Sequence, residues 1–313
     1  MWTVVWMALV VLAGLAGGSY YFYGKAIKRA KKDFLDGDPG LAMVPGAREA
    51  SAANAAWWSR QPFEQWEITS HDGIRLRAFY LKAKAPTNKT AIVAHGYSGQ
   101  ASLMGGKARL YWEKLGYNIL VPDARGHGAS GGAYIGFGWP ERKDCAQWIG
   151  RILEADGADA RIVLHGVSMG AATVMMTSGE SLPANVRAIV ADCGYTSVKD
   201  ELSYQLRRMY KLPVFPLLHV TSLMTKLRAG YFFGEASALA QVRKSRTPIL
   251  FIHGDADRFV PTDMVYRLYE NCPADKRIYV VPNAGHGYAE FADPDRYRTE
   301  VASFIEHYVA QGS

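Results

Sequence analysis

The stretch RIVLHGVSMGAATVMM, residues 161–176, decides the fold of this chain. Its first five residues form an apolar run typical of a buried strand, and the residues from Gly170 onward are compatible with a helix. Between the two lies Gly166-Val167-Ser168-Met169-Gly170, a Gly-x-Ser-x-Gly pentapeptide. An ordinary turn would explain five such residues alone. A strand before and a helix after favour a strained elbow with Ser168 at its apex, where glycines leave the space that the turn needs.

Strand-like and helix-like segments alternate on both sides of this elbow. Continuous apolar runs, which suit parallel strands covered on both faces, occur at residues 90–94, 118–122, 161–165, 186–191, 248–253 and 277–281. Helices are predicted between and after them, at residues 103–115, 140–155, 170–178, 263–271 and 295–310. The order predicts an open, mostly parallel, doubly wound α/β sheet, with functional residues at the carboxyl ends of its strands.

Two further strands are predicted before this series. Residues 64–70 and 74–81 are joined by the hairpin signal His71-Asp72-Gly73. In the second, apolar and polar residues alternate, as expected for a half-exposed antiparallel strand at the edge of the sheet. The segment from about 195 to 240 is longer and more apolar than a connection between two strands needs, which predicts a helical cap over the pocket above Ser168. Extra helices beside the sheet are the alternative.

The amino-terminal 24 residues contain no charged side chain and are long enough for a helix that crosses the ~30 Å hydrocarbon layer. A signal peptide is the alternative, but such a peptide normally begins with positive charges. Here the charges follow, at Lys25, Lys28, Arg29, Lys31 and Lys32, which predicts a single-pass anchor with the catalytic domain on the cytoplasmic side. The predicted division is an anchor at 1–24, a basic juxtamembrane segment and linker at 25–62, and a catalytic domain at 63–313.

Composition excludes several other classes of protein. The 36 Lys and Arg against 29 Asp and Glu give a modest charge of +7, without the basic stripe and interleaved aromatic residues of a nucleic-acid binder. Cys145, Cys193 and Cys272 are scattered without metal-ligand or redox spacing, so neither a disulfide framework nor a metal site is predicted. No dinucleotide-binding fingerprint follows the early strand, and no cofactor is expected.

A serine hydroxyl needs a base that accepts its proton and an acid that orients the base. His286 lies in a glycine-flanked loop after the strand at 277–281, and Asp257 follows the strand at 248–253. Asp255 and Asp192 are the rival acids, since both also follow strands. His95, His165 and His253 end strands beside glycine and are expected to hold loops by hydrogen bonds, and His127 is expected to shape the rim of the site.

From about Phe63 to its end, the chain resembles a serine hydrolase of the α/β-hydrolase superfamily, in the bacterial branch with an amino-terminal membrane anchor. The family pattern of His-Gly after the third strand is matched by His95-Gly96-Tyr97, and the pattern Asp-x-Arg-Gly-His-Gly-x-Ser is matched by residues 123–130. The pattern His-Gly-x-x-Asp-x-x-Val-Pro is matched by residues 253–261 and favours Asp257 over Asp255.

The resemblance implies roles for these residues. Ser168 is the expected nucleophile, His286 the base and Asp257 the acid, with the backbone N–H groups of Tyr97 and Met169 as the expected oxyanion hole. It implies hydrolysis of carboxylic esters through an acyl-enzyme, and the Met, Leu, Phe and Tyr content of the predicted cap favours a small-molecule substrate with an acyl or aromatic acid part. Amide or peptide hydrolysis, thioesterase or acyltransferase activity, and a non-catalytic ligand-binding protein are the alternatives.

Overall fold

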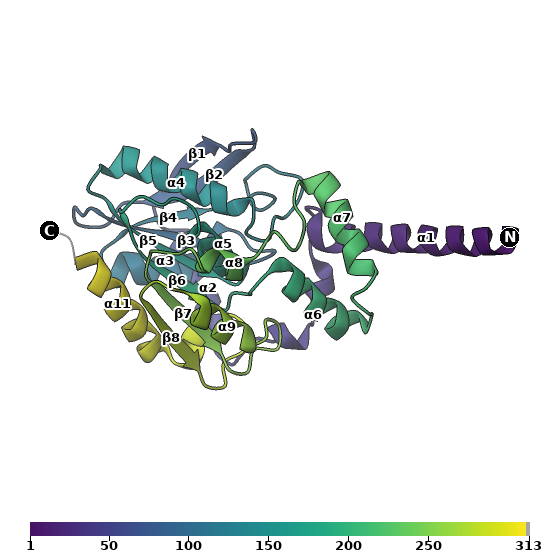
Figure 1. The fold of residues 1–313 in the computed structure, drawn as a ribbon. Helices are drawn as coiled ribbons and strands as arrows, with labels where there is room; N and C mark the ends of the chain where they lie inside the picture. The colour runs from purple at the N-terminus through teal and green to yellow at the C-terminus, as the bar shows by residue number, and fades with distance from the viewer. Residues whose placement is uncertain (311–313) are drawn as a thin grey trace.

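The computed structural model describes residues 1–310, and an eight-stranded sheet forms its centre (Figure 1). The strand order is β1-β2-β4-β3-β5-β6-β7-β8. Pairing is antiparallel between β1 and β2 and between β2 and β4, and parallel from β4 to β8. The strands are β1 (Glu64–Thr69), β2 (Arg75–Leu81), β3 (Lys89–Ala94), β4 (Asn118–Pro122), β5 (Arg161–Val167), β6 (Val186–Asp192), β7 (Ile249–Gly254) and β8 (Lys276–Val281). The predicted sheet is confirmed.

One detail of the prediction is wrong. The strand at 74–81 was expected at the edge of the sheet, but β2 has a neighbour on each side and β1 forms the edge. Its alternation has another cause: Leu76, Ala78 and Tyr80 point into the core, whereas Arg77 and Phe79 on the opposite face are half-buried. Alternation along a strand reports how its two faces are covered and carries no information about the neighbouring strands.

Helices cover both faces of the sheet, as in a doubly wound fold. One face packs against α4 (Glu141–Asp156), α5 (Met169–Thr177), α8 (Ala238–Val242) and α9 (Asp263–Asn271). The other packs against α2 (Ala47–Trp58), α3 (Gly105–Arg109), η5 (Leu110–Lys114), α10 (Ala289–Ala292) and α11 (Pro294–Ala310). The helix predicted at 103–115 is thus divided into η4 (Ala101–Met104), α3 and η5. The last three residues of the predicted domain, 311–313, lie outside the described residues.

Two cap helices are inserted between β6 and β7. They are α6 (Val198–Tyr210) and α7 (Leu217–Ala229), and Figure 1 shows both beyond the end of the sheet, with α7 beside the base of α1 (Trp2–Phe22). The predicted helical insertion is confirmed. Helix α1 projects from the cap (Figure 1). The Trp2–Ile27 segment is long and apolar enough to cross a membrane, and only 6% of its most apolar 18-residue stretch is buried in the protein.

The end of α1 is packed into the cap. Phe22 lies edge-on against Tyr210 of α6, with ring centroids 4.9 Å apart. The guanidinium of Arg228 in α7 lies 5.4 Å from the centre of the Tyr20 ring and 5.5 Å from that of Tyr23. The helix then continues as the π-helical turn η1 (Tyr23–Ile27), in which Ile27 is fully buried.

The segment expected as a linker, 25–62, is held on the domain by specific contacts. Arg29 donates to the carbonyl oxygens of Ser130 and Gly128, at 2.6 and 2.8 Å. The buried Lys32 ammonium donates to the carbonyl oxygens of Lys25 and Lys28, at 2.7 and 2.8 Å, and so holds the end of η1. Burial, together with the nearby Lys25 charge, lowers the pKa of Lys32 to about 8.

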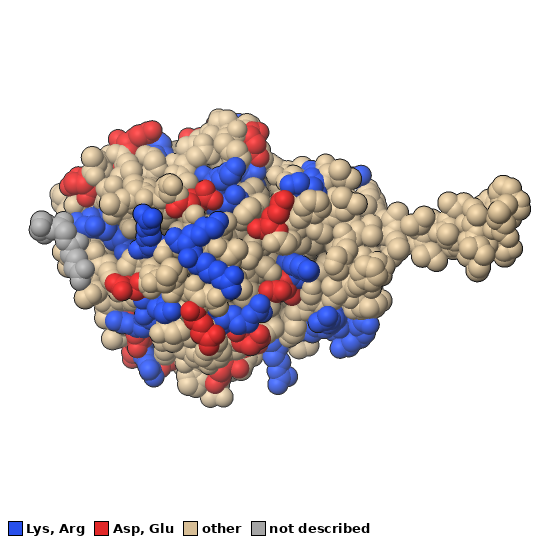
Figure 2. All heavy atoms as spheres, viewed as in Figure 1, with Lys and Arg blue, Asp and Glu red and all other residues tan. Residues whose placement is uncertain are grey.

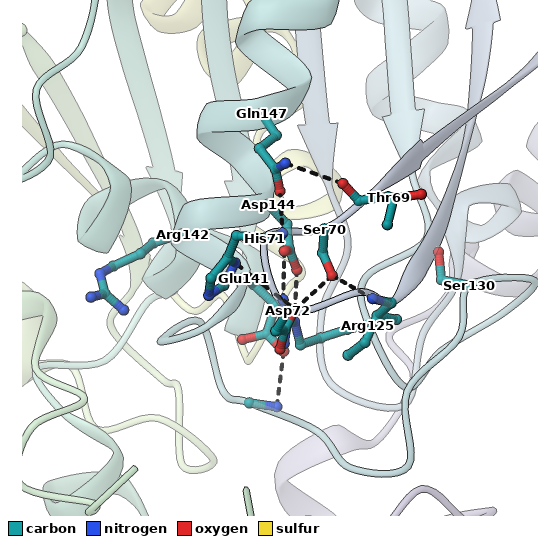
Figure 3. A network of polar contacts seen from close by, with 12 residues as sticks. Thr69, Ser70, His71, Asp72, Arg125, Ser130, Glu141, Arg142, Asp144 and Gln147 are labelled. Atoms are coloured by element: carbon teal, nitrogen blue, oxygen red, sulfur yellow. Dashed lines mark hydrogen bonds and ion pairs between the residues drawn. The ribbon is translucent and has the colours of Figure 1, made fainter. Parts of the chain in front are cut away.

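A buried ion-pair network connects the first hairpin to the loop after β4 (Figure 3). The Arg125 guanidinium is fully buried and donates to Asp144 of α4, at 2.6 and 2.7 Å, and to Asp72 of the hairpin, at 2.8 and 3.2 Å. A buried charge is tolerated when it is paired and hydrogen-bonded in this way. The network therefore fixes the loop of residues 123–130 next to the carboxyl ends of the parallel strands.

Candidate active site

Ser168 lies at the turn between β5 and α5 with φ of 56° and ψ of −116°, a backbone conformation that is strained for any residue but glycine. The flanking glycines allow this turn because the chains approach too closely for a side chain. A Cβ at Gly166 would collide with the carbonyl of Gly170, and a Cβ at Gly170 would collide with the carbonyl of Ala94. The pentapeptide thus forms the elbow that the sequence predicts.

The structure brings Ser168, His286 and Asp257 together at the carboxyl ends of β5, β8 and β7. The Ser168 hydroxyl oxygen lies 2.8 Å from Nε2 of His286. Nδ1 of the same ring lies 2.7 Å from Oδ2 of Asp257. All three residues are buried, which keeps bulk water from competing for these hydrogen bonds. The arrangement allows a proton to pass from the hydroxyl to the imidazole while the carboxylate fixes the tautomer.

Asp257 is held as a carboxylate by its surroundings. Burial alone would raise the pKa of Asp257, but the imidazoles of His286 and His253 hold that pKa well below its usual range. Its Oδ1 accepts the backbone N–H groups of Phe259 and Val260, at 2.9 and 2.8 Å. Nε2 of His253 donates to the Val260 carbonyl, at 2.9 Å, and lies 3.3 Å from Oδ2 of Asp257.

The two rival acids have other partners. Asp192 accepts the Tyr297 hydroxyl, at 2.8 Å, and lies 3.5 Å from the Lys107 ammonium. Asp255 accepts the backbone N–H of Asn283, at 2.6 Å, and so joins the loops after β7 and β8. The geometry favours Asp257 as the partner of His286.

His95, His165 and His127 lie in structural positions. Nε2 of His95 accepts the backbone N–H of Ala124, at 3.0 Å, which joins the loops after β3 and β4. His165 contacts the hydroxyls of Tyr111 and Tyr297, at 3.1 and 3.3 Å. Burial lowers the pKa of both rings. His127 lies against the Arg125 carbonyl, and burial with the nearby His95 lowers its pKa to about 3, so it is neutral at physiological pH.

The two backbone donors expected at an oxyanion hole lie next to Ser168. Met169 is the first residue of α5, and the first N–H groups of a helix have no partner within the helix. Tyr97 follows Gly96, and a Cβ at Gly96 would lie 3.3 Å from the Ser168 Cβ, so this loop passes directly beside the serine. The Tyr97 hydroxyl donates to the Ala26 carbonyl in η1, at 2.7 Å. The loop is thereby connected to the end of α1.

Cys193 is a neighbour of this site that sequence spacing does not reveal. Its sulfur and ligand atoms of Asp257 and His286 lie within 4.8 Å of one another, a grouping close enough to hold a metal ion. The chemistry of these three residues does not favour a metal site, since both His286 nitrogens are already hydrogen-bonded, to Asp257 and to Ser168. Burial also raises the pKa of the Cys193 thiol well above its usual value, whereas a metal ligand must be the thiolate.

A cavity of about 880 Å³, including its open mouth, lies above Ser168. Most of its lining is apolar or aromatic, with contributions from Tyr97, Phe137, Tyr195, Leu202, Leu206, Met209, Leu217, Leu218, Phe233, Phe259 and Val260.

Glu201 is a buried carboxyl group in this lining that sequence reasoning did not find. One of its oxygens accepts the Gln205 side chain, at 2.7 Å, and the other has no hydrogen-bond partner. Burial raises the pKa of Glu201 to about 8, so this carboxyl group is mostly protonated and uncharged at neutral pH. A glutamate in the first turn of a helix is ordinary in sequence, and only the folded cap buries it.

Comparison with known proteins agrees with this architecture. Residues 91–300 match the model of the Alpha/beta hydrolase family. The uncharacterized Bacillus subtilis protein YqkD is 32% identical over 252 residues, covering 79% of this chain and 82% of that protein. An uncharacterized membrane protein of Saccharomyces cerevisiae, YNL320W, is 23% identical over 72% of this chain and 74% of its own length. The Pyrococcus furiosus esterase Pf2001 has the same fold, with a TM-score of 0.66 and 22% identity over 81% of this chain and 95% of that one. The chain belongs to the alpha/beta hydrolase family.

Proposed function

We propose that this protein is a serine hydrolase that cleaves carboxylic esters through an acyl-enzyme intermediate. The observation that carries the proposal is the chain of short contacts from the Ser168 hydroxyl through His286 to Asp257. The strained elbow, which exposes the hydroxyl at the base of a cavity, supports it.

The proposed reaction has two halves. His286 takes the Ser168 proton while the serine oxygen bonds to the ester carbonyl carbon, and the N–H groups of Tyr97 and Met169 stabilise the resulting oxyanion. The C–O bond to the alcohol then breaks, and the alcohol leaves with the proton from His286. Water, deprotonated by His286, attacks the acyl carbon, the bond from that carbon to the Ser168 oxygen breaks, and the serine takes the proton from His286 as the carboxylic acid leaves. Asp257 stabilises the imidazolium in both halves.

The lining of the cavity supports an apolar acyl or aromatic acid part. Each buried methylene contributes about 0.8 kcal/mol to binding, and a neutral Glu201 leaves little charge to oppose an apolar group. Glu201 also favours amide or peptide hydrolysis as the second candidate, because a substrate ammonium group beside its unpartnered oxygen would favour the ionised carboxylate and pair with it. Thioesters and acyl transfer use the same acyl-enzyme and differ in the leaving group or the second nucleophile.

Labelling by a fluorophosphonate probe tests the proposal. The full chain should be labelled, Ser168→Ala should lose labelling, and His286→Ala should be labelled far more slowly. If Ser168→Ala is labelled as strongly as the wild type, the nucleophile is a different residue. Hydrolysis of p-nitrophenyl esters beside that of aminoacyl anilides then separates ester from amide preference.

We further propose that α1 anchors the protein in a membrane as a single span. Its 21 residues extend about 31 Å, at 1.5 Å per residue, which matches the ~30 Å hydrocarbon layer. The burial of Ser19, Tyr23 and Ile27 in the folded protein favours a retained anchor over a cleaved signal peptide. The exposed Lys28 and Lys31 beyond the span support the cytoplasmic side for the catalytic domain. The proposed division remains an anchor at 1–24, a juxtamembrane segment at 25–62 and a hydrolase domain from 63 onward.

A further inference from the structure

The cavity above Ser168 extends to the end of α1. Ser168 contributes to one part of its lining, and Phe22, Lys25 and Ala26 contribute to another. These three residues lie at or directly after the end of the helix that we propose as the membrane span. Ser168 and the residues at the end of α1 therefore line one continuous cavity. This cavity connects the proposed nucleophile with the position at which the chain would leave the bilayer.

Helix α7 lies beside the last turns of α1, at the same level. A Cβ at Gly18 would lie 3.2 Å from Cδ1 of Leu217, so the two helices are in contact there. Leu217 also lines the cavity, together with Leu218 and Thr221 of α7. The cavity is therefore bordered on two sides by elements that meet at the proposed membrane interface.

The surface of the cap beside α1 has the character of a membrane-contacting face. It exposes Leu212, Phe215, Leu223 and Leu227, with exposed fractions between 38% and 79%. Figure 2 shows a mostly uncharged surface around the base of α1, with Lys and Arg at its border. Exposed apolar side chains bordered by basic ones suit the interface of a bilayer with anionic headgroups.

We propose that the substrate is an ester with a long hydrocarbon chain that enters the cavity directly from the bilayer holding α1, between the base of α1 and the cap. The inference rests on the proposed serine hydrolase activity and on the proposed anchor. The hydrocarbon chain lies against the apolar walls formed by α6, α7 and η1, and the ester carbonyl lies at Ser168. Hydrolysis consumes one water: His286 passes the Ser168 proton to the leaving alcohol and then passes a proton of the water back to Ser168 as the fatty acid is released.

The test uses the full chain reconstituted in phosphatidylcholine vesicles. In one arm p-nitrophenyl palmitate is dissolved in the vesicles that carry the protein, and in the other arm it is dissolved in separate, protein-free vesicles. We expect release of p-nitrophenol to be at least about tenfold faster when protein and ester share a bilayer. Equal rates in the two arms overturn the inference, because the ester would then arrive through water.

p-Nitrophenyl acetate, which is supplied from water, separates the proposed esterase activity from the proposed entry of the substrate through the bilayer. Hydrolysis of the acetate with equal palmitate rates in both arms removes the bilayer route and leaves the esterase proposal standing. If the protein hydrolyses neither ester and does not react with a fluorophosphonate, both the esterase proposal and the bilayer route are wrong.

A matched pair of substitutions tests the path itself. Leu217→Trp fills the cavity near α1 at a half-buried position, and we expect it to lower the ratio of palmitate to acetate hydrolysis at least tenfold. Leu103→Trp makes the same change at a position on η4 that is 68% exposed, and it should leave both rates unchanged. An unchanged ratio in Leu217→Trp contradicts the proposed path.

Discussion

Asp257 lies between two imidazoles, and both of its carboxylate oxygens are engaged. Oδ1 accepts two backbone N–H groups, whereas Oδ2 contacts Nδ1 of His286 and Nε2 of His253. Three of these neighbours donate to the carboxylate when His286 has its proton on Nδ1, namely the two backbone N–H groups and His286, whereas the N–H of His253 is directed to the Val260 carbonyl. An amide in this position would present an N–H group to one of these donors, and the favourable tautomer of His286 would be lost.

We therefore expect Asp257→Asn to lower kcat by about 10⁴-fold, the loss that a wrong tautomer causes in a comparable serine hydrolase. Steady-state hydrolysis of p-nitrophenyl butyrate measures it. Asp192→Asn is the matched control, because Asp192 contacts Tyr297 and Lys107, and it should retain most of the activity. A large loss in Asp192→Asn with an active Asp257→Asn would reassign the acid.

Because Glu201 is buried, the free energy of unfolding should depend on pH. Its pKa is about 8 in the folded protein, against 4.5 for an unperturbed glutamate. Below pH 4.5 the folded and unfolded chains both hold the proton. As the pH rises from 4.5 to 8, the unfolded chain loses its proton first, so the free energy of unfolding falls by up to about 1.4 kcal/mol per pH unit.

Glu201→Gln remains neutral and should lack this decline. Thermal unfolding of both proteins at pH 5 and pH 8 measures the difference, and wild type should lose more stability than Glu201→Gln across that interval. The same loss in both proteins would mean that the Glu201 carboxyl group has reached solvent.

The site residues and Glu201 differ in how far the sequence predicts them. Ser168, Asp257 and His286 each follow a strand, and parallel strands that end at one edge bring such residues together, so their proximity is predictable. The burial of Glu201 depends on how α6 lies over the sheet. That position depends on packing between segments far apart in the chain, which local patterns do not encode.

At the scale of elements, loops are fixed here by paired charges as well as by apolar packing. The Arg125 guanidinium connects three elements that the sequence shows only as separate segments: the β1–β2 hairpin, α4 and the loop after β4. The motif of residues 123–130 revealed the loop, but the partners Asp72 and Asp144 follow from the three-dimensional arrangement alone. The contact of α1 with the cap is another such case, since two apolar segments do not by themselves indicate that they meet.

Removal of the Arg125 charge should destabilise the protein strongly. Arg125→Met leaves the buried Asp144 carboxylate unpaired, and we expect a loss of about 3–5 kcal/mol in the free energy of unfolding, measured by denaturant titration. The double variant Arg125→Met, Asp144→Leu removes both charges and should recover a substantial part of that loss. A double variant as unstable as the single one would show that the packing of the guanidinium, rather than charge balance, dominates.

At the scale of the whole molecule, α1 is both a projecting helix and part of the cap. Its outer turns are exposed, but its last turns and η1 contribute to the cavity and support the Tyr97 loop. The sequence predicts the apolar helix from its composition. It does not predict where the exposed part of this helix ends and the packed part begins, because that boundary is set by the side chains that pack against α7.

Two truncations separate these roles. A chain without residues 2–17 should leave the membrane fraction and still hydrolyse p-nitrophenyl acetate, because those residues lie outside the packed part of α1. A chain without residues 2–27 should lose most of that activity, since a wall of the cavity and the partner of Tyr97 are removed. Fractionation and acetate hydrolysis measure both properties. Equal activity in the two truncated proteins would contradict a role of η1 in the site.

The burial of the three cysteines makes it possible to test by thiol labelling on which side of a membrane the hydrolase domain lies. Cys145, Cys193 and Cys272 are all free and buried, and burial raises the pKa of each thiol. A membrane-impermeant maleimide should therefore not react with the folded wild-type protein, so the wild type is the negative control. A single new thiol at a position such as Asp295, whose side chain is 98% exposed, would report from intact and permeabilised cells which compartment surrounds the hydrolase domain.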